Sequence, residues 1–273
     1  DDPGGFRLFT LASVIFSLSL IPVLLTRTHA PLPEPPGPLR ILPVLRNSHV
    51  GFYGALAAGL MNAAFYTMGP LFGIAIGFSV EQISLFMAVG ILGGLVLQMP
   101  IGRLSDRVER RLVITGVSVA VGLACLTMVL LVAFNAPLYA ILAGSFGYGC
   151  LSFTLYSLSA AHANDWGDPQ RRMQTSGALL AGFGIGAVVG PLVAGWLMGE
   201  LGPQGLFIFN GVIALLLALY SFAHAFKPRP QPKTPFVPQP GTPFSADELY
   251  QAAQEGADNR EQISKAAKTD PTP

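Results

Sequence analysis

The stretch Gly102-Arg-Leu-Ser-Asp-Arg-Val-Glu-Arg-Arg111 is the densest cluster of charge in an otherwise apolar chain. Apolar runs long enough to cross a bilayer lie on both sides of it. An arginine-rich segment between two such runs is typical of a short cytoplasmic connection between two transmembrane helices. We therefore expect the chain to be an all-α integral membrane protein, with this stretch as one of its loops.

The composition agrees with a membrane protein. Of the 273 residues, 51% are hydrophobic and only 11% are charged, whereas soluble domains carry roughly 25% charged residues. The 31 glycines suit helices that approach each other closely in lipid. The formal net charge of +1 gives no support for a nucleic-acid partner. The partner that composition predicts is the lipid bilayer.

The sequence gives little support for an enzymatic activity. Cys125 and Cys150 both fall in apolar segments, where we expect them to be small buried hydrophobic side chains. No Cys/His cluster has the spacing of a metal site, and the predicted spans contain no paired acid and base or activated nucleophile. The sequence predicts no metal site, no cofactor and no enzymatic activity.

Seven apolar runs predict seven transmembrane helices, since roughly 20 residues cross the hydrocarbon core. Their predicted ranges are 6–25, 48–77, 81–101, 112–134, 137–163, 175–198 and 205–226.

Local signals mark several ends and irregularities of these helices. Pro22 predicts a kink or a stop near the end of the first run. Gly69-Pro70 predicts a break in the second, either a functional hinge or a packing bend. Ser79-Val-Glu-Gln82 predicts a capping box at the start of the third, and Asn135-Ala-Pro137 predicts a tight turn before the fifth.

The distribution of Lys and Arg predicts the orientation. The 27–47 segment, the 102–111 loop, the loop with Arg171 and Arg172, and the segment after residue 226 all carry basic residues. The connections near Glu81, Asn135 and Glu200 carry none. The positive-inside rule then places the basic segments in the cytoplasm. We expect an integral protein of the bacterial inner membrane, with the proline-rich segment, the charged loop and the tail all cytoplasmic.

Within the charged stretch, the residue types predict specific roles. We expect Gly102 to let the chain turn sharply at the end of a span. We expect Asp106 near the start of the next helix, where a carboxylate meets unpaired amides. The arginines hold the loop in the cytoplasm and pair with Asp106, Glu109 or lipid phosphates.

The order Gly-x-Leu-Ser-Asp-Arg-x-x-Arg-Arg between two spans resembles the signature loop of the major facilitator superfamily of transporters. The resemblance implies that this loop latches two six-helix halves together on the cytoplasmic side, with Asp106 as its central residue. Glu109 departs from the family pattern, which has Gly at that place. The site residues carried over from the signature loop are Gly102, Asp106, Arg107, Arg110 and Arg111.

The same resemblance implies the domain organisation. The loop follows the third predicted span, although in the family it follows the second helix of each half. The first span is therefore expected to be the last helix of a missing amino half, over 1–26. The ranges 27–47, 48–226 and 227–273 are then the cytoplasmic linker, the six-helix carboxyl half and a disordered cytoplasmic tail. The start at Asp1, without an initiator Met, also indicates the middle of a longer protein.

A second resemblance lies in the sixth predicted span. The run Gly-x-x-x-Gly-Pro-x-x-x-Gly is similar to the Gly-Pro motif that antiporters of this family carry in another helix. Close packing of helices through small residues would explain the same pattern, and both interpretations stay open. The residues concerned are Gly182, Gly186, Gly190, Pro191 and Gly195.

No Asp, Glu, Lys or Arg lies in the middle of a predicted span, so a proton site would have to lie in the missing half. Neutral polar and aromatic residues remain. If they face a central cavity, they suit a largely apolar or aromatic substrate; if not, they form interhelical hydrogen bonds of about 0.6 kcal/mol each. The candidate cavity residues are Asn62, Tyr66, Gln98, Tyr148, Ser152 and Tyr156.

The function expected from these features is secondary transport of a small molecule, in which two halves rock about a midplane site. The Gly-Pro run extends this expectation to efflux by proton antiport. The expected partners are the bilayer, the substrate and the missing amino half. The alternative is a membrane sensor or assembly factor that uses the same helical scaffold without transporting.

Overall fold

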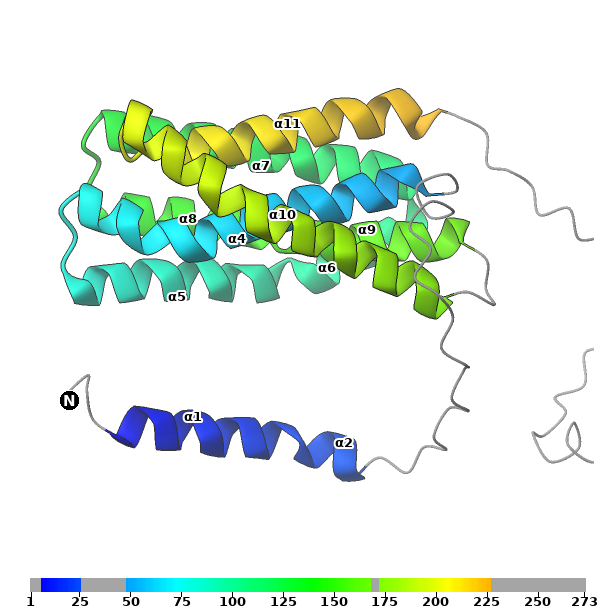
Figure 1. The fold of residues 1–273 in the computed structure, drawn as a ribbon, viewed down its shortest axis with the longest axis horizontal. Helices are drawn as coiled ribbons and strands as arrows, with labels where there is room; N and C mark the ends of the chain where they lie inside the picture. Colours follow the sequence, from blue (N-terminus) through cyan, green and yellow to red (C-terminus); the bar gives the residue numbers. More distant parts are fainter. Residues whose placement is uncertain (1–5, 26–47, 168–171, 227–273) are drawn as a thin grey trace, which may run out of the picture. The chain divides into compact units, whose positions relative to one another are not determined.

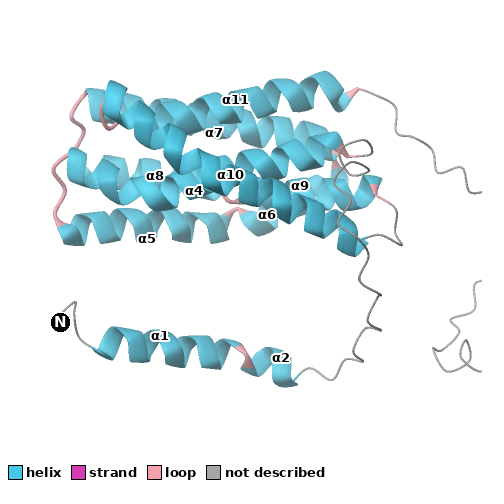
Figure 2. Ribbon diagram, in the orientation of Figure 1, coloured by secondary structure: helices cyan, strands magenta, loops and turns pink. Residues whose placement is uncertain are grey.

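The computed structural model describes residues 6–25, 48–167 and 172–226. The predicted linker, the predicted tail and part of the Arg171-Arg172 loop lie outside these ranges. Within them, every regular element is a helix (Figure 2). The all-α fold class is confirmed.

The first predicted span is two short helices, α1 (Phe6–Ser19) and α2 (Ile21–Leu25). The interruption at Leu20 places Pro22 in the first turn of α2, where a missing backbone N–H does not weaken the helix. The sequence therefore predicted correctly that Pro22 disturbs this run. Most of the exposed side chains of the pair are apolar.

Eight further helices form a bundle. They are α4 (His49–Ala75), α5 (Val80–Val96), α6 (Gln98–Arg107), α7 (Arg110–Ala133), α8 (Leu138–Ser152), α9 (Thr154–Trp166), α10 (Arg172–Leu201) and α11 (Gly205–Ala225). They make six segments that are long and apolar enough to cross a membrane, because α5 continues into α6 and α8 into α9. The part of the chain described thus has six full-length spans and one shorter apolar helix, Phe9–Ser19.

Two spans are interrupted where no break was predicted. The interruption at Leu97 has a local cause, since Pro100 has no N–H to continue the helical ladder. The interruption at Phe153 has another, since Thr154 donates its hydroxyl to the carbonyl of Leu151 at 2.7 Å. Hydroxyls that bond back to the preceding turn bend helices.

Gly69-Pro70 does not interrupt the helix, because α4 runs through Pro70. Gly69 is buried and packs against the Met87 and Phe86 side chains, which hold this part of the helix in place. Neighbouring helices in a bundle make a proline tolerable inside a span.

α4 is the central helix of the bundle. It packs against α10, α9, α11, α5 and α8, while α7 pairs with α11 and α5 with α8. Figure 1 shows α10 crossing over α4. Fully buried aromatic side chains fill the centre between these helices: Phe65, Phe72, Phe86, Tyr148 and Phe207.

The crossing of α10 over α4 is made by glycines. A Cβ at Gly186 would collide with the backbone of Leu56 and Leu60, and one at Gly190 with the backbone of Leu60. The side-chain positions of Gly182 and Gly195 also meet α4, at Phe52 and Met68. The glycine run therefore brings two helix backbones into direct contact.

The two ends of the bundle differ. We call the end that carries Arg110 and Arg111 the arginine end; α4 begins there and α11 ends there. At the opposite end are three short turns, in which Gly77, Asn135 and Gly202 take positive φ angles of 81°, 48° and 75°. The predicted capping box is confirmed: the Gln82 amide donates to Ser79 Oγ at 3.3 Å, and the Ser79 amide donates to Gln82 Oε1 at 2.9 Å.

Candidate functional site

The charged stretch is mostly helix. Gly102 lies inside α6 and Asp106 in its last turn, so only Val108 and Glu109 separate α6 from α7. The predictions that Gly102 makes the turn and that Asp106 begins the next helix are therefore wrong. Val108 and Glu109 reverse the chain with negative φ angles of −118° and −54°, which any residue adopts, so no glycine is required.

Arg110 ties three helices together at this end. Its Nη2 lies 2.8 Å from Asp106 Oδ1 on α6, and its Nε lies 2.7 Å from Asp165 Oδ2 on α9. A carboxylate at the end of α6 faces the negative end of the helix dipole, which is unfavourable, and the Arg110 guanidinium offsets this. The predicted pairing with Asp106 is confirmed for Arg110.

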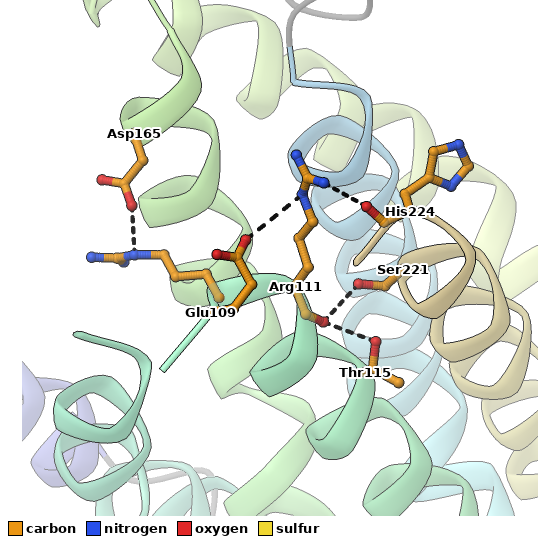
Figure 3. A network of polar contacts seen from close by, with 7 residues as sticks. Glu109, Arg111, Thr115, Asp165, Ser221 and His224 are labelled. Carbon is orange, nitrogen blue, oxygen red and sulfur yellow. Dashed lines mark hydrogen bonds and ion pairs between the residues drawn. The ribbon is translucent and has the colours of Figure 1, made fainter. Parts of the chain in front are cut away.

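Arg111 lies deeper, with 3% of its surface exposed. It donates from Nη1 to the carbonyl of His224 on α11, and its Nε lies 3.9 Å from Glu109 Oε1 (Figure 3). Its guanidinium stacks 3.8 Å from the centre of the Trp166 ring on α9. These contacts give the buried cation a carbonyl acceptor, a nearby carboxylate and an aromatic ring, so Arg111 joins α7, α9 and α11 within this bundle.

The backbone of Arg111 has partners as well. Its carbonyl oxygen accepts from Thr115 Oγ1 at 2.8 Å and from Ser221 Oγ at 2.9 Å (Figure 3). Three residues of the signature loop thus have two kinds of environment. Arg110 and Asp106 reach the surface, and Arg111 is fixed between helices.

A cavity of about 190 Å³ lies next to Asp106, between α6 and α9. Gln98, Gly102, Ser105 and Arg110 contribute to its wall. Ser105 is 2% exposed, and its hydroxyl has no hydrogen-bond partner among the described residues. A Cβ at Gly102 would meet open space, so the glycine leaves room here. Arg107, the remaining signature residue, is exposed.

Three of the six candidate cavity residues belong to one buried network. The Ser152 hydroxyl lies 3.1 Å from Asn62 Oδ1 and 3.2 Å from the Tyr148 hydroxyl. Asn210 Nδ2 donates to that tyrosine hydroxyl at 2.9 Å. Each hydroxyl has one hydrogen, so the consistent direction runs from Asn210 through Tyr148 and Ser152 to Asn62.

This network lies inside the bundle and not on a cavity wall. Tyr148, Ser152 and Asn210 are 0% exposed and Asn62 is 7% exposed. The four residues come from α4, α8 and α11, so for these positions the structure supports interhelical hydrogen bonding. Asn210 Oδ1 has no partner among the described residues.

The other three candidates lie at the surface of the bundle. Tyr66 is 47% exposed and stacks on Phe153, with 5.4 Å between ring centres and 29° between planes. Half-buried Tyr156 meets Phe183 edge to face at 5.2 Å. Exposed Gln98 donates to the Ser157 hydroxyl at 3.3 Å. We call the surface formed by Tyr66, Phe153, Tyr156 and Phe183 the aromatic face.

The sequence reasoning did not identify several of these residues. Asn210 could have been found from the sequence, because it is the only amide side chain in an apolar run of twenty-one residues. Asp165 and Trp166 could not, since their partners Arg110 and Arg111 lie far away along the chain. The described residues contain no group of three or more His, Cys, Asp or Glu side chains that could hold a metal ion.

Comparison with known proteins gives consistent matches. The family model described as Major Facilitator Superfamily matches residues 3–164 and 75–257. An uncharacterized MFS-type transporter of Enterobacter sp. strain 638 is 32% identical over 203 residues, which are 74% of this chain and 51% of that protein. The uncharacterized MFS-type transporter YcaD of Escherichia coli strain UMN026 is 30% identical over 187 residues, 67% of this chain and 47% of that protein.

A third relative, an uncharacterized MFS-type transporter of Yersinia enterocolitica, is 30% identical over 194 residues. Those residues are 70% of this chain and 47% of that protein. The chain spans about half the length of the curated relatives it matches.

Proposed function

Because the chain belongs to the major facilitator superfamily, we propose that it forms one six-helix half of a secondary transporter that moves a small molecule by alternating access. The six full-length spans agree in number with one half, and the relatives are about twice as long as the matched region. In this proposal α1 and α2 belong to the last helix of the other half.

We propose that the arginine end faces the cytoplasm and that the membrane is the bacterial inner membrane. The support is the positive-inside rule. Arg103, Arg107, Arg110 and Arg111 lie at or near that end, whereas the turns at the opposite end carry no Lys or Arg.

The observation that carries the transport proposal is the aromatic face. It lies mainly on α4 and α8–α9, the two least hydrophobic spans, with mean hydropathies of 1.2 and 1.4 against 1.9 to 2.4 for the others. Both spans also pack against several other helices, so the proposal rests on the exposed residues of the face and not on hydropathy alone. Phe153, Tyr156 and Ser157 are spaced to share one side of α9. The face suits a largely apolar or aromatic substrate with a few hydrogen-bonding groups.

We assign the latch role to Asp106. Its carboxylate is 65% exposed although it is paired with Arg110, so it remains available to a second half that packs on α6. A more specific proposal is that the transporter exports its substrate by proton antiport. It rests on the resemblance of the Gly182–Gly195 run alone, and these glycines already have a packing role against α4.

The test is dye transport by the whole protein in proteoliposomes, with ethidium as the aromatic probe. Tyr66→Ala is expected to lower the rate several-fold. Leu71→Ala, which truncates another exposed side chain of α4 that is off the aromatic face, is expected to leave it unchanged. Equal rates in the two variants would remove the aromatic face from the mechanism.

A second arm tests the latch. Asp106→Asn is expected to lower transport and to change the accessibility of a cysteine reporter at the arginine end, with Asp165→Asn as the matched control, since both carboxylates pair with Arg110. If both variants transport and gate like the wild type, Asp106 is not a latch.

A further inference from the structure

A groove between α4 and α11 is not used by the proposed transport mechanism. It has a volume of about 360 Å³. Its wall consists of apolar and aromatic side chains from the two helices, among them Tyr53, Leu60, Leu216 and Tyr220. Neither helix carries an acidic residue. The groove is therefore a place for an apolar group that excludes water.

One end of the groove is polar. The Tyr220 hydroxyl lies 3.2 Å from His49 Nδ1, and the rings of His49 and His224 are 4.6 Å apart. His224 Nδ1 donates to the carbonyl of Tyr220 at 2.8 Å. All three side chains are partly exposed. The hydrogen-bonded His49–Tyr220 pair can donate one N–H or O–H to a phosphate, and His224, whose Nδ1–H is used by the Tyr220 carbonyl, adds an Nε2–H donor when its ring is protonated.

The depth of the groove fits one leaflet of a bilayer. His49 is the first residue of α4, and the groove residues Tyr53 to Leu60 follow it by 4 to 11 positions. Ile213 to Tyr220 precede His224 by the same 4 to 11 positions on α11. At 1.5 Å per residue the groove runs from roughly 6 to 17 Å below the polar end. Half of a hydrocarbon core is roughly 15 Å.

The surface beside the groove is apolar. The mean hydropathy of α11 is 2.2, and its outward side chains Leu215, Leu219 and Phe222 are 52%, 68% and 51% exposed. A helix with such a surface faces lipid chains. The groove thus opens where phospholipids are the surrounding solvent, with its polar end at the level of their headgroups.

We propose that the groove is a phospholipid site, in which one acyl chain lies between α4 and α11 and the phosphate binds at His49, Tyr220 and His224. Arg111 donates to the carbonyl of His224 and so holds the end of α11 in place next to this site. The bound lipid joins the first and the last helix of the bundle.

The experiment is native mass spectrometry and thermal unfolding of the whole purified protein with three additives: phosphatidylglycerol, diacylglycerol with the same chains, and inorganic phosphate. We expect phosphatidylglycerol to remain bound and to raise the Tm by several degrees. Diacylglycerol is expected to bind several-fold more weakly, and phosphate alone to have no effect. Equal binding of diacylglycerol would overturn the phosphate part of the proposal.

Leu216→Trp fills the groove, and Leu219→Trp places the same ring on the exposed side of the same helix as its control. Only the first is expected to lose the lipid and the rise in Tm. Tyr220→Phe removes a single hydroxyl and is expected to weaken phosphatidylglycerol binding but not diacylglycerol binding. Equal lipid retention by both tryptophan variants, or a change of oligomeric state specific to Leu216→Trp, would overturn the lipid assignment.

Discussion

Two polar networks join the helices of the bundle, and they consist of different kinds of contact. In the interior, Asn62, Ser152, Tyr148 and Asn210 join α4, α8 and α11 through neutral hydrogen bonds of 2.9 to 3.2 Å. At the arginine end, Arg110 and Arg111 join α6, α7, α9 and α11 through ion pairs, a carbonyl and an aromatic ring.

The difference follows from depth. Asn62 lies 13 positions along α4 from His49, which is roughly 20 Å from the arginine end. A charge at that depth is far from water and headgroups, whereas a charge at the end of a helix is close to both. Neutral groups are therefore used inside and charged groups outside. Four substitutions test this account; each is compared by the free energy of unfolding of the whole protein in detergent titrations.

Asn62→Asp should have the largest effect. It puts an acid in the middle of a span, where a charge costs about 2.5–3.5 kcal/mol. The control is Asn164→Asp, the same change at an exposed position near the end of α9, which should be nearly neutral. Similar losses in both variants would show that depth does not distinguish the two networks.

Arg111→Ala should come next. It removes a charged hydrogen bond to the His224 carbonyl and the stack on Trp166. We expect a loss of about 1.5–3 kcal/mol. Arg111→Lys keeps the charge but not the planar fork, and it should restore only part of the loss. Full stability in the alanine variant would mean that the buried guanidinium does not hold α11.

Ser152→Ala should have a smaller effect. The hydroxyl connects Asn62 to Tyr148, and interhelical hydrogen bonds in membranes contribute about 0.6 kcal/mol each, up to about 1.7. The exposed Ser176 of α10 supplies the matched Ser176→Ala control. No difference between the two serines would indicate that water or a rearranged network replaces the lost hydroxyl.

Asp106→Asn should have the smallest effect on stability. The pair with Arg110 is exposed, and such i,i+4 pairs contribute about 0.3–0.5 kcal/mol. Arg110 also keeps Asp165 as a partner. A stable Asp106→Asn protein that transports poorly would separate the latch role from folding, whereas a loss of several kcal/mol would make Asp106 a structural residue.

Much of the bundle could be predicted from the sequence because the spans are set by local properties. The capping box at Ser79 and the turn at Asn135 were predicted correctly, since each depends on side chains within three residues. The extension of α6 through Asp106 was not predicted, since charged residues at a membrane surface are compatible with either a loop or a helical end.

The candidate site was harder to predict. Helical spacing put Tyr148, Ser152 and Tyr156 in one stripe, but the break at Phe153 separates them and buries the first two. The pattern also did not identify Phe153 and Phe183, which look like ordinary apolar residues until Tyr66 and Tyr156 are found against them.

The sequence by itself determined that this is a helical membrane protein, how many spans it has, and where charge is excluded, because hydrocarbon selects residues by their own polarity. Only the tertiary structure decided which of two arginines is buried, which side of α4 meets backbone and which side stays open, and which polar residues meet each other. These features depend on the orientation and the spacing of helices that are distant in sequence. The residue pairs that then form cannot be predicted from the sequence of any single span.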